Sequence, residues 1–165
     1  MAGGFTMRII FVCQGNIIRS PLAENMFRYL ARERGVGEKY QLDSAGTSAY
    51  HVGEPPDHRM RQVADNNGFE YTGRAKQFRV EDFDQFELVI AMDKANQRYL
   101  EMKSLPGEQR SKIHLMREYD PEGKPGLDVP DPYYGGLDGF EVTFEIVKRS
   151  CQGLMEALES ETSTP

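Results

Sequence analysis

The segment RIIFVCQGNIIRSPLAENMF, residues 8–27, joins an apolar run to a helix through a cysteine, five residues and an arginine. The apolar run covers residues 7–12, with Arg8 as the one charged residue inside it, and is typical of a strand covered on both faces. A helix is predicted over residues 20–34, where Ser20 can cap the first turn. Cys13 therefore lies where a buried strand passes into a helix.

The rest of the chain continues the alternation of strands and helices. Further strands are predicted in residues 40–47, 86–93 and 112–116, and further helices in residues 56–67, 94–102 and 138–159. This alternation predicts a parallel sheet with helices on both faces. Ligands bind such folds beyond the carboxyl ends of the strands, and Cys13 lies at such an end. The length of 165 residues fits a single domain over 1–165.

Composition limits the classes of partner. The net charge of −6 disfavours non-specific binding to nucleic acid or to an anionic membrane. No apolar run has the length of a transmembrane helix. Cys13 and Cys151 cannot make a disulfide framework, so we expect a cytoplasmic protein. His51, His58 and His114 are scattered without the spacing of a zinc site, and we expect no metal or cofactor.

The loop between the first strand and its helix has the residues of a phosphate cradle. Backbone N–H groups and the positive end of the helix dipole would face an anion, and Arg19 can bind two of its oxygens. Gly15 and Asn16 are residue types that tolerate the left-handed conformation. The same positive groups favour the thiolate form of Cys13, and the Ser20 hydroxyl can donate to it. Such a thiolate can attack phosphorus and form a thiophosphate ester that water hydrolyses.

Attack on phosphorus needs a general acid for the leaving oxygen. The candidate is Asp131 in VPDPYYGG, residues 129–136, within a Pro- and Gly-rich acidic loop over 118–139. The prolines on both sides restrict its backbone. Tyr133 and Tyr134 follow and can wall a slot for an aromatic ring, or can half-pack on the sheet as part of an ordinary acidic turn. Three other acids are alternatives: Asp120, Asp128 and Asp138.

Together these motifs resemble the low-molecular-weight protein tyrosine phosphatases. VCQGNIIRSPLAE (12–24) resembles the phosphate-binding loop of the family, and DSAGT (43–47), VGEPPD (52–57), AMDKAN (91–96) and DPYYG (131–135) resemble its other landmarks in order. The resemblance implies an α/β three-layer sandwich, with a four-stranded parallel sheet flanked by helices on both faces. It also implies metal-independent hydrolysis of phosphotyrosine, in a tyrosine-phosphorylated protein, and of aryl phosphates.

The resemblance implies roles for single residues as well. Cys13 would be the nucleophile, Arg19 the phosphate clamp and Asp131 the general acid. The implied substrate-binding residues are Gln14, Gly15, Asn16, Ile17, Ile18, Ser20, Tyr50, Tyr133 and Tyr134, with Ser44 as structural support for the loop. Phosphate, vanadate or sulfate-like anions should bind in this loop, and the protein is expected to be a monomer or a weak dimer.

Three positions distinguish this chain within the family pattern. Ile18 stands where members commonly carry a second cysteine, so Cys13 lacks a neighbour with which to form a reversible disulfide. Gly73 stands in a region where some relatives place a histidine that braces the loop. Ile17 resembles the pattern of the tyrosine phosphatases, whereas arginine phosphatases tend to show threonine.

Two other functions are compatible with parts of this pattern. An arsenate reductase on the same fold would need further cysteines to relay a disulfide, and Cys151, on the apolar stripe of the last helix, does not supply them. A phosphate- or phosphopeptide-binding module would need Arg19 and the loop but neither Cys13 nor Asp131.

Overall fold

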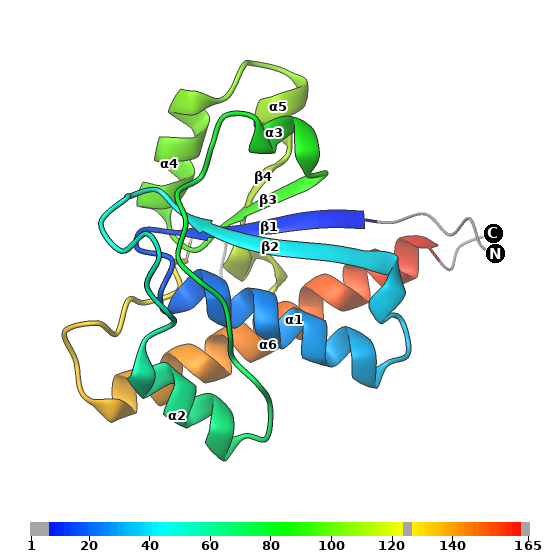
Figure 1. The fold of residues 1–165 in the computed structure, drawn as a ribbon. Helices are drawn as coiled ribbons and strands as arrows, with labels where there is room; N and C mark the ends of the chain where they lie inside the picture. Colours follow the sequence, from blue (N-terminus) through cyan, green and yellow to red (C-terminus); the bar gives the residue numbers. More distant parts are fainter. Residues whose placement is uncertain (1–6, 124–126, 163–165) are drawn as a thin grey trace.

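The computed structural model describes residues 7–123 and 127–162, and a four-stranded sheet lies at its centre (Figure 1). The strands are β1 (Met7–Cys13), β2 (Tyr40–Gly46), β3 (Leu88–Ala91) and β4 (Ile113–Leu115). All neighbouring strands are parallel, in the order β2-β1-β3-β4. The predicted four-stranded parallel sheet is confirmed, and β1 has a neighbour on each side.

Helices cover both faces of the sheet, as predicted. Figure 1 shows α1 (Arg19–Glu33), α2 (His58–Asn66) and α6 (Leu137–Thr162) on one side, and α3 (Asp82–Gln85) and α4 (Lys94–Lys103) on the other. The short helices α3 and α5 (Glu108–Ser111), and the 3-10 helices Gly37–Lys39 and Met116–Tyr119, were not predicted. Elements of three or four residues are too short to show a hydrophobic period.

Strand β1 divides its side chains between two apolar clusters, because successive side chains of a strand point to opposite faces. Ile9, Phe11 and Cys13 belong to the cluster that includes α1 and α6. Ile10 and Val12 belong to the cluster on the other face, which includes residues of α3 and α4. The apolar run therefore marks a strand covered on both faces, and Cys13 leaves the sheet on the side of α1.

Helix α6 packs its apolar stripe into the core. The predicted inward residues are all buried: Phe140, Phe144, Val147, Cys151, Leu154, Met155 and Leu158. Cys151 is a free cysteine with no exposed surface, and burial raises the pKa of its thiol. It is a core residue, as predicted. No helix in the described part of the chain, α6 included, combines the length and the apolar character that crossing a membrane requires.

The start of α1 differs from the prediction. The helix begins at Arg19, and its N-cap residue is Ile18, which makes no capping hydrogen bond through its side chain. Ser20 is therefore not the cap, and its hydroxyl lies instead 3.0 Å from the sulfur of Cys13. At the other end Gly35 follows the last turn with a φ of 78°, a conformation that suits glycine, so the helix ends as predicted.

The predicted loop over 118–139 contacts the carboxyl end of β3 through its described part. Its residues 124–126 lie outside the described residues, and the described residues 120–123 and 127–136 contain neither helix nor strand. The N–H of Val129 donates to the carbonyl of Met92, immediately after β3, at 2.8 Å. This contact holds residue 129 of the loop close to the end of β3.

Candidate active site

A cavity of about 360 Å³ opens at the carboxyl end of β1. It collects most of the residues that were predicted to form the site: Cys13, Gln14, Gly15, Ile17, Ile18, Arg19, Tyr50, Asp131, Tyr133 and Tyr134. Ser48 and His51 line it as well and were not predicted. Asn16, Ser20 and Ser44 are buried behind the loop and do not line the cavity.

Cys13 lies at the floor of this cavity with 3% of its surface exposed. Its Sγ accepts a hydrogen bond from the N–H of Asn16 at 3.2 Å. Asn16 has a φ of 58°, the left-handed conformation that asparagine tolerates. Gly15 was expected to share this conformation but does not have a positive φ. Its lack of a side chain matters for another reason, because a Cβ there would lie 3.0 Å from the ring of His51.

The side chain of Asn16 is the centre of a hydrogen-bond network behind the loop. Its amide nitrogen donates to the hydroxyls of Ser20, at 2.9 Å, and Ser44, at 3.0 Å. Its oxygen accepts from the N–H of Lys76 at 2.9 Å. Ser44 in turn donates to the carboxylate of Glu24 at 2.7 Å. Buried hydrogen bonds are costly to break without replacement, so this network holds the loop in one conformation.

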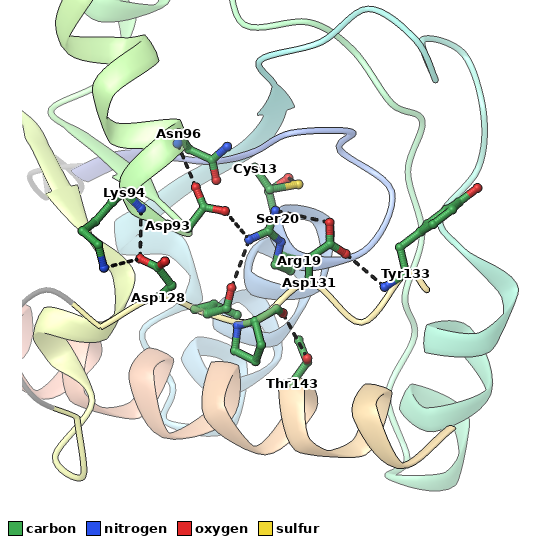
Figure 2. A network of polar contacts seen from close by, with 12 residues as sticks. Cys13, Arg19, Ser20, Asp93, Lys94, Asn96, Asp128, Asp131, Tyr133 and Thr143 are labelled. Atoms are coloured by element: carbon green, nitrogen blue, oxygen red, sulfur yellow. Dashed lines mark hydrogen bonds and ion pairs between the residues drawn. The ribbon is translucent and has the colours of Figure 1, made fainter. Parts of the chain in front are cut away.

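Arg19 extends its guanidinium beneath the cavity with 3% of its surface exposed. Nη1 donates to Asp93 at 2.7 Å and to the carbonyl of Val129 at 3.0 Å, and Nη2 lies 3.7 Å from Asp131 (Figure 2). Burial alone would lower the pKa of Arg19, but the negative charges of Cys13, Asp93 and Asp131 outweigh burial and raise it. Arg19 is therefore a cation whose planar fork is held in one orientation.

Asp93 was not predicted as a site residue, although the sequence carried a signal for it. It follows β3, and neighbouring parallel strands place their carboxyl ends at the same edge of the sheet. Its second oxygen accepts from the N–H of Asn96 at 2.8 Å and so caps α4. One carboxylate thus anchors Arg19 and begins a helix.

Asp131 is the carboxylate of its loop that lines the cavity. Its side chain is 42% exposed, and one oxygen accepts from the N–H of Tyr133 at 3.1 Å. The three alternative acids do not line the cavity. Asp128 pairs with Lys94, and Asp120 pairs with Arg117 and Arg149. Asp138 lies in the first turn of α6.

Aromatic rings surround the mouth of the cavity. The rings of Tyr133 and Tyr134 meet edge to face with centroids 4.9 Å apart, and Tyr134 is 96% exposed. His51 lies between Tyr50 and Tyr133, with ring centroids at 4.8 and 6.2 Å. The Nδ1 atom of His51 is 3.0 Å from a carboxylate oxygen of Glu54. His51 was missed because nothing in its local sequence relates it to Gly15, where a Cβ would meet its ring.

No cluster of three or more His, Cys, Asp or Glu side chains within residues 7–123 and 127–162 is arranged to hold a metal ion. Both cysteines of the chain are free. The ionisable groups that line the cavity include the thiol of Cys13, the guanidinium of Arg19 and the carboxylate of Asp131.

The chain is similar to known phosphatases over nearly its whole length. Residues 8–164 match the model of the family described as low molecular weight phosphotyrosine protein phosphatase. The low molecular weight protein-tyrosine-phosphatase of Streptomyces coelicolor is 41% identical over 157 residues, which cover 94% of this chain and 96% of that protein. The human low molecular weight phosphotyrosine protein phosphatase is 38% identical over 157 residues, covering 94% and 98%.

The fold agrees with a solved structure of the same kind. A crystal structure of a protein tyrosine phosphatase from Entamoeba histolytica, with Hepes in the active site, matches with a TM-score of 0.89 at 36% identity. The match covers 95% of this chain and 99% of that chain. The chain therefore belongs to the low molecular weight phosphotyrosine protein phosphatase family of hydrolases.

Proposed function

We propose that this phosphatase hydrolyses phosphotyrosine in proteins through a phosphorylated cysteine, with Cys13 as the nucleophile and Asp131 as the general acid. One observation carries the proposal. A buried sulfur, a buried guanidinium and a partly exposed carboxylate meet in one cavity, at the end of a strand and the start of a helix. These are the groups that attack, bind and protonate in a phosphoryl transfer.

In the first step the Cys13 thiolate attacks phosphorus. A sulfur–phosphorus bond forms, the bond from phosphorus to the tyrosine oxygen breaks, and Asp131 gives its proton to that oxygen. Arg19 and the loop N–H groups bind the other phosphate oxygens. Ser20 supports the thiolate, because its hydroxyl accepts from Asn16 and can turn its own proton toward Sγ, 3.0 Å away.

In the second step water regenerates the enzyme. The Asp131 carboxylate takes a proton from water, the water oxygen attacks phosphorus, and the sulfur–phosphorus bond breaks to release phosphate and the thiolate. The cycle needs no reductant and no second thiol. An arsenate reductase would need such a thiol, but Ile18 lines the cavity here and Cys151 packs against Ala23 in the core.

The mouth of the cavity favours an aromatic phosphate ester. Tyr50, Tyr133 and Tyr134 present ring surfaces that can pack against a tyrosine ring while its phosphate reaches Cys13. Ile17 adds an apolar side chain to the same wall. The loop should also bind phosphate, vanadate or sulfate-like anions. The Entamoeba histolytica relative supports this expectation, because Hepes, which carries a sulfonate, occupies its active site.

The test is phosphate release from a phosphotyrosine peptide at about pH 5.5 with a metal chelator present. We expect Cys13→Ser to lower turnover by about 10⁴-fold or more while vanadate still binds. Cys151→Ala is the matched control, because it removes the other thiol of the chain from the core, and it should keep turnover. Equal turnover by Cys13→Ser and wild type would exclude Cys13 as the nucleophile.

Substrate choice is tested in the same assay with phosphoserine and phosphoarginine peptides of the same sequence. We expect both to be poor substrates, because neither presents an aromatic ring to the tyrosine side chains at the mouth. Faster release from phosphoarginine than from phosphotyrosine would contradict the substrate assignment and leave the role of Cys13 intact.

A further inference from the structure

The back of the phosphate loop contacts a tyrosine hydroxyl that the steps above do not use. Tyr71 is 4% exposed and lies between α2 and α3 in the chain. Its hydroxyl oxygen is 2.7 Å from the carbonyl oxygen of Ile18 and 3.1 Å from that of Ile17. The side chain does not line the cavity, so any effect on the reaction must pass through the loop.

We infer that Tyr71 is a positioning residue, whose hydroxyl orients the peptide groups of the loop so that their N–H groups face the bound phosphate. A peptide group is planar and trans, so its carbonyl and the N–H of the next residue point in opposite directions. The carbonyls of Ile17 and Ile18 point to Tyr71. The N–H groups of Ile18 and Arg19 therefore point away from it. The inference rests on the proposed role of the loop as a phosphate cradle.

The hydroxyl of Tyr71 can act in this way because it keeps its proton. Burial raises the pKa of Tyr71 well above its ordinary value, and the negative charges of Cys13 and Asp57 raise it further. The group is neutral over the whole range in which the enzyme is expected to work. It can donate to one carbonyl at a time, and the shorter distance is to Ile18.

Each carbonyl also accepts from a backbone N–H. Asp57 donates to Ile17 at 2.7 Å, and Leu22 donates to Ile18 at 3.2 Å, the long end of the usual range for such a bond. Removing the hydroxyl of Tyr71 would thus leave neither carbonyl without a donor. We expect the loop to loosen while the fold remains, and the loosening to be greatest at Ile18.

The segment 69–77 braces the loop at two points. One is the hydroxyl of Tyr71, and the other is the N–H of Lys76, which binds Asn16. Gly73 lies between them with a φ of 134°, and a Cβ at this position would meet nothing within 4 Å. In this chain the segment therefore acts through a buried hydroxyl and a backbone group, and position 73 contributes no side chain.

The test compares Tyr71→Phe with Tyr40→Phe. Tyr40 is the matched control, because its hydroxyl is also partly buried and donates to Glu159, on the far part of α6. We expect Tyr71→Phe to weaken vanadate binding about tenfold and to raise KM for a phosphotyrosine peptide by a similar factor, with kcat changed by less than about threefold. The enzyme–substrate complex and the transition state lose the same contacts to the loop, so vanadate affinity and KM change more than kcat.

Tyr40→Phe should lower the melting temperature but keep vanadate affinity and KM within about twofold of wild type. Hydrogen exchange at the N–H groups of Ile18 and Arg19 should be faster in Tyr71→Phe and unchanged in Tyr40→Phe. Equal vanadate affinity in Tyr71→Phe and wild type would overturn the inference. An equal loss in both variants would also overturn it, since general destabilisation would then explain the effect.

The two proposals fail separately in this design. If phosphotyrosine proved not to be a substrate while Tyr71→Phe still bound vanadate more weakly than Tyr40→Phe, the positioning role of Tyr71 would stand and the proposed function would fall.

Discussion

The two loops that meet at the cavity are held in different ways. The phosphate loop, residues 13–20, is mostly buried, and the side chain of Asn16 bonds to Ser20 within the loop and to Ser44 and Lys76 outside it. The acid loop, residues 128–136, exposes Asp131 and Tyr134 at the surface. Its backbone carbonyls accept from Arg19 at Val129 and from Thr143 at Pro130 (Figure 2). The carbonyl of Tyr133 accepts from Arg59.

This difference matches what each loop has to do in the proposed mechanism. Binding a dianion requires several N–H groups at set positions before the substrate arrives. A general acid instead has to approach leaving groups of different size, so one well-placed carboxyl on an accessible loop suffices. We therefore expect changes in the phosphate loop to slow every substrate, and changes in the acid loop to slow mainly those with poor leaving groups.

Arg19→Lys should have the largest effect among the changes that test this contrast. Lysine keeps the positive charge but lacks the fork that binds Asp93 and Val129 on one side and phosphate on the other. We expect kcat/KM to fall by about 10³-fold for good and poor leaving groups alike. Arg34→Lys is the matched control, because Arg34 follows the same helix and pairs on the surface with Glu156. A loss in Arg19→Lys confined to poor leaving groups would contradict the clamp.

Asp131→Asn should have the next largest effect and should depend on the leaving group. We expect a loss of about 10²-fold for a phenol that leaves poorly, and little loss for one that leaves well without a proton. Because the proposed mechanism needs Cys13 as a thiolate and Asp131 with its proton at the same time, we expect a bell-shaped pH profile for turnover by wild type. In Asp131→Asn, the decline of activity on the high-pH side of this profile should disappear.

Two variants separate Asp131 from its neighbours in that experiment. Asp128→Asn, on the same loop, removes a carboxylate that pairs with Lys94 and should keep the bell-shaped dependence of activity on pH. His51→Gln tests the imidazole that lines the cavity. If His51→Gln abolished the alkaline fall and Asp131→Asn retained it, the general acid would be His51.

The elements that could be predicted from the sequence are those whose local residue pattern agrees with their place in the fold. The apolar run of β1, the stripe of α6 and the loop between Cys13 and Arg19 each carry their signal within one segment. The error at Ser20 shows the limit of local rules. A serine before a proline is a good helix cap, but here a buried sulfur lies 3.0 Å from its hydroxyl.

The residues that sequence reasoning missed act across long separations in the chain. Asp93 reaches Arg19 only because β3 lies next to β1, and this strand order could have been used to find it. Tyr71 and Arg59 offer no such signal. Both approach the site from segments whose course is set by packing, so their contacts could not be read from periodicity or turn residues.

Arg59→Met should lower activity less than the changes above, because it disturbs the acid loop and leaves the phosphate loop in place. Arg59 donates to the carbonyl of Tyr133 at 3.1 Å, pairs with Asp57 and lies over the rings of Tyr133 and Phe140. Methionine keeps an apolar stem but loses the hydrogen bond and the charge. We expect kcat to fall about tenfold for a poor leaving group, because Asp131 is less well placed, with vanadate affinity unchanged.

Arg61→Met is the control for Arg59, because Arg61 is on the same helix and exposed. It should change neither kcat nor vanadate affinity. Weaker vanadate binding in Arg59→Met would show that the loss of Arg59 disturbs the phosphate loop as well. The N–H of Asp57, which binds the carbonyl of Ile17, would be the route for that disturbance.

Ile18→Cys should change turnover the least of these variants. It should have a separate effect on the recovery of activity after oxidation. In wild type, peroxide converts the Cys13 thiolate to a sulfenic acid that has no neighbouring thiol, so further oxidation to the irreversible sulfinic acid competes with rescue. The introduced thiol would condense with the sulfenic acid, releasing water and forming a disulfide that dithiothreitol reduces. After equal peroxide exposure, we expect dithiothreitol to restore a larger share of each protein's own starting activity in Ile18→Cys than in wild type.

Cys151→Ala should recover like wild type, because Cys151 is buried in the core. Equal recovery in all three proteins would mean that the cavity itself protects the oxidised sulfur, and the rigidity of the phosphate loop would then be the first place to look for the cause.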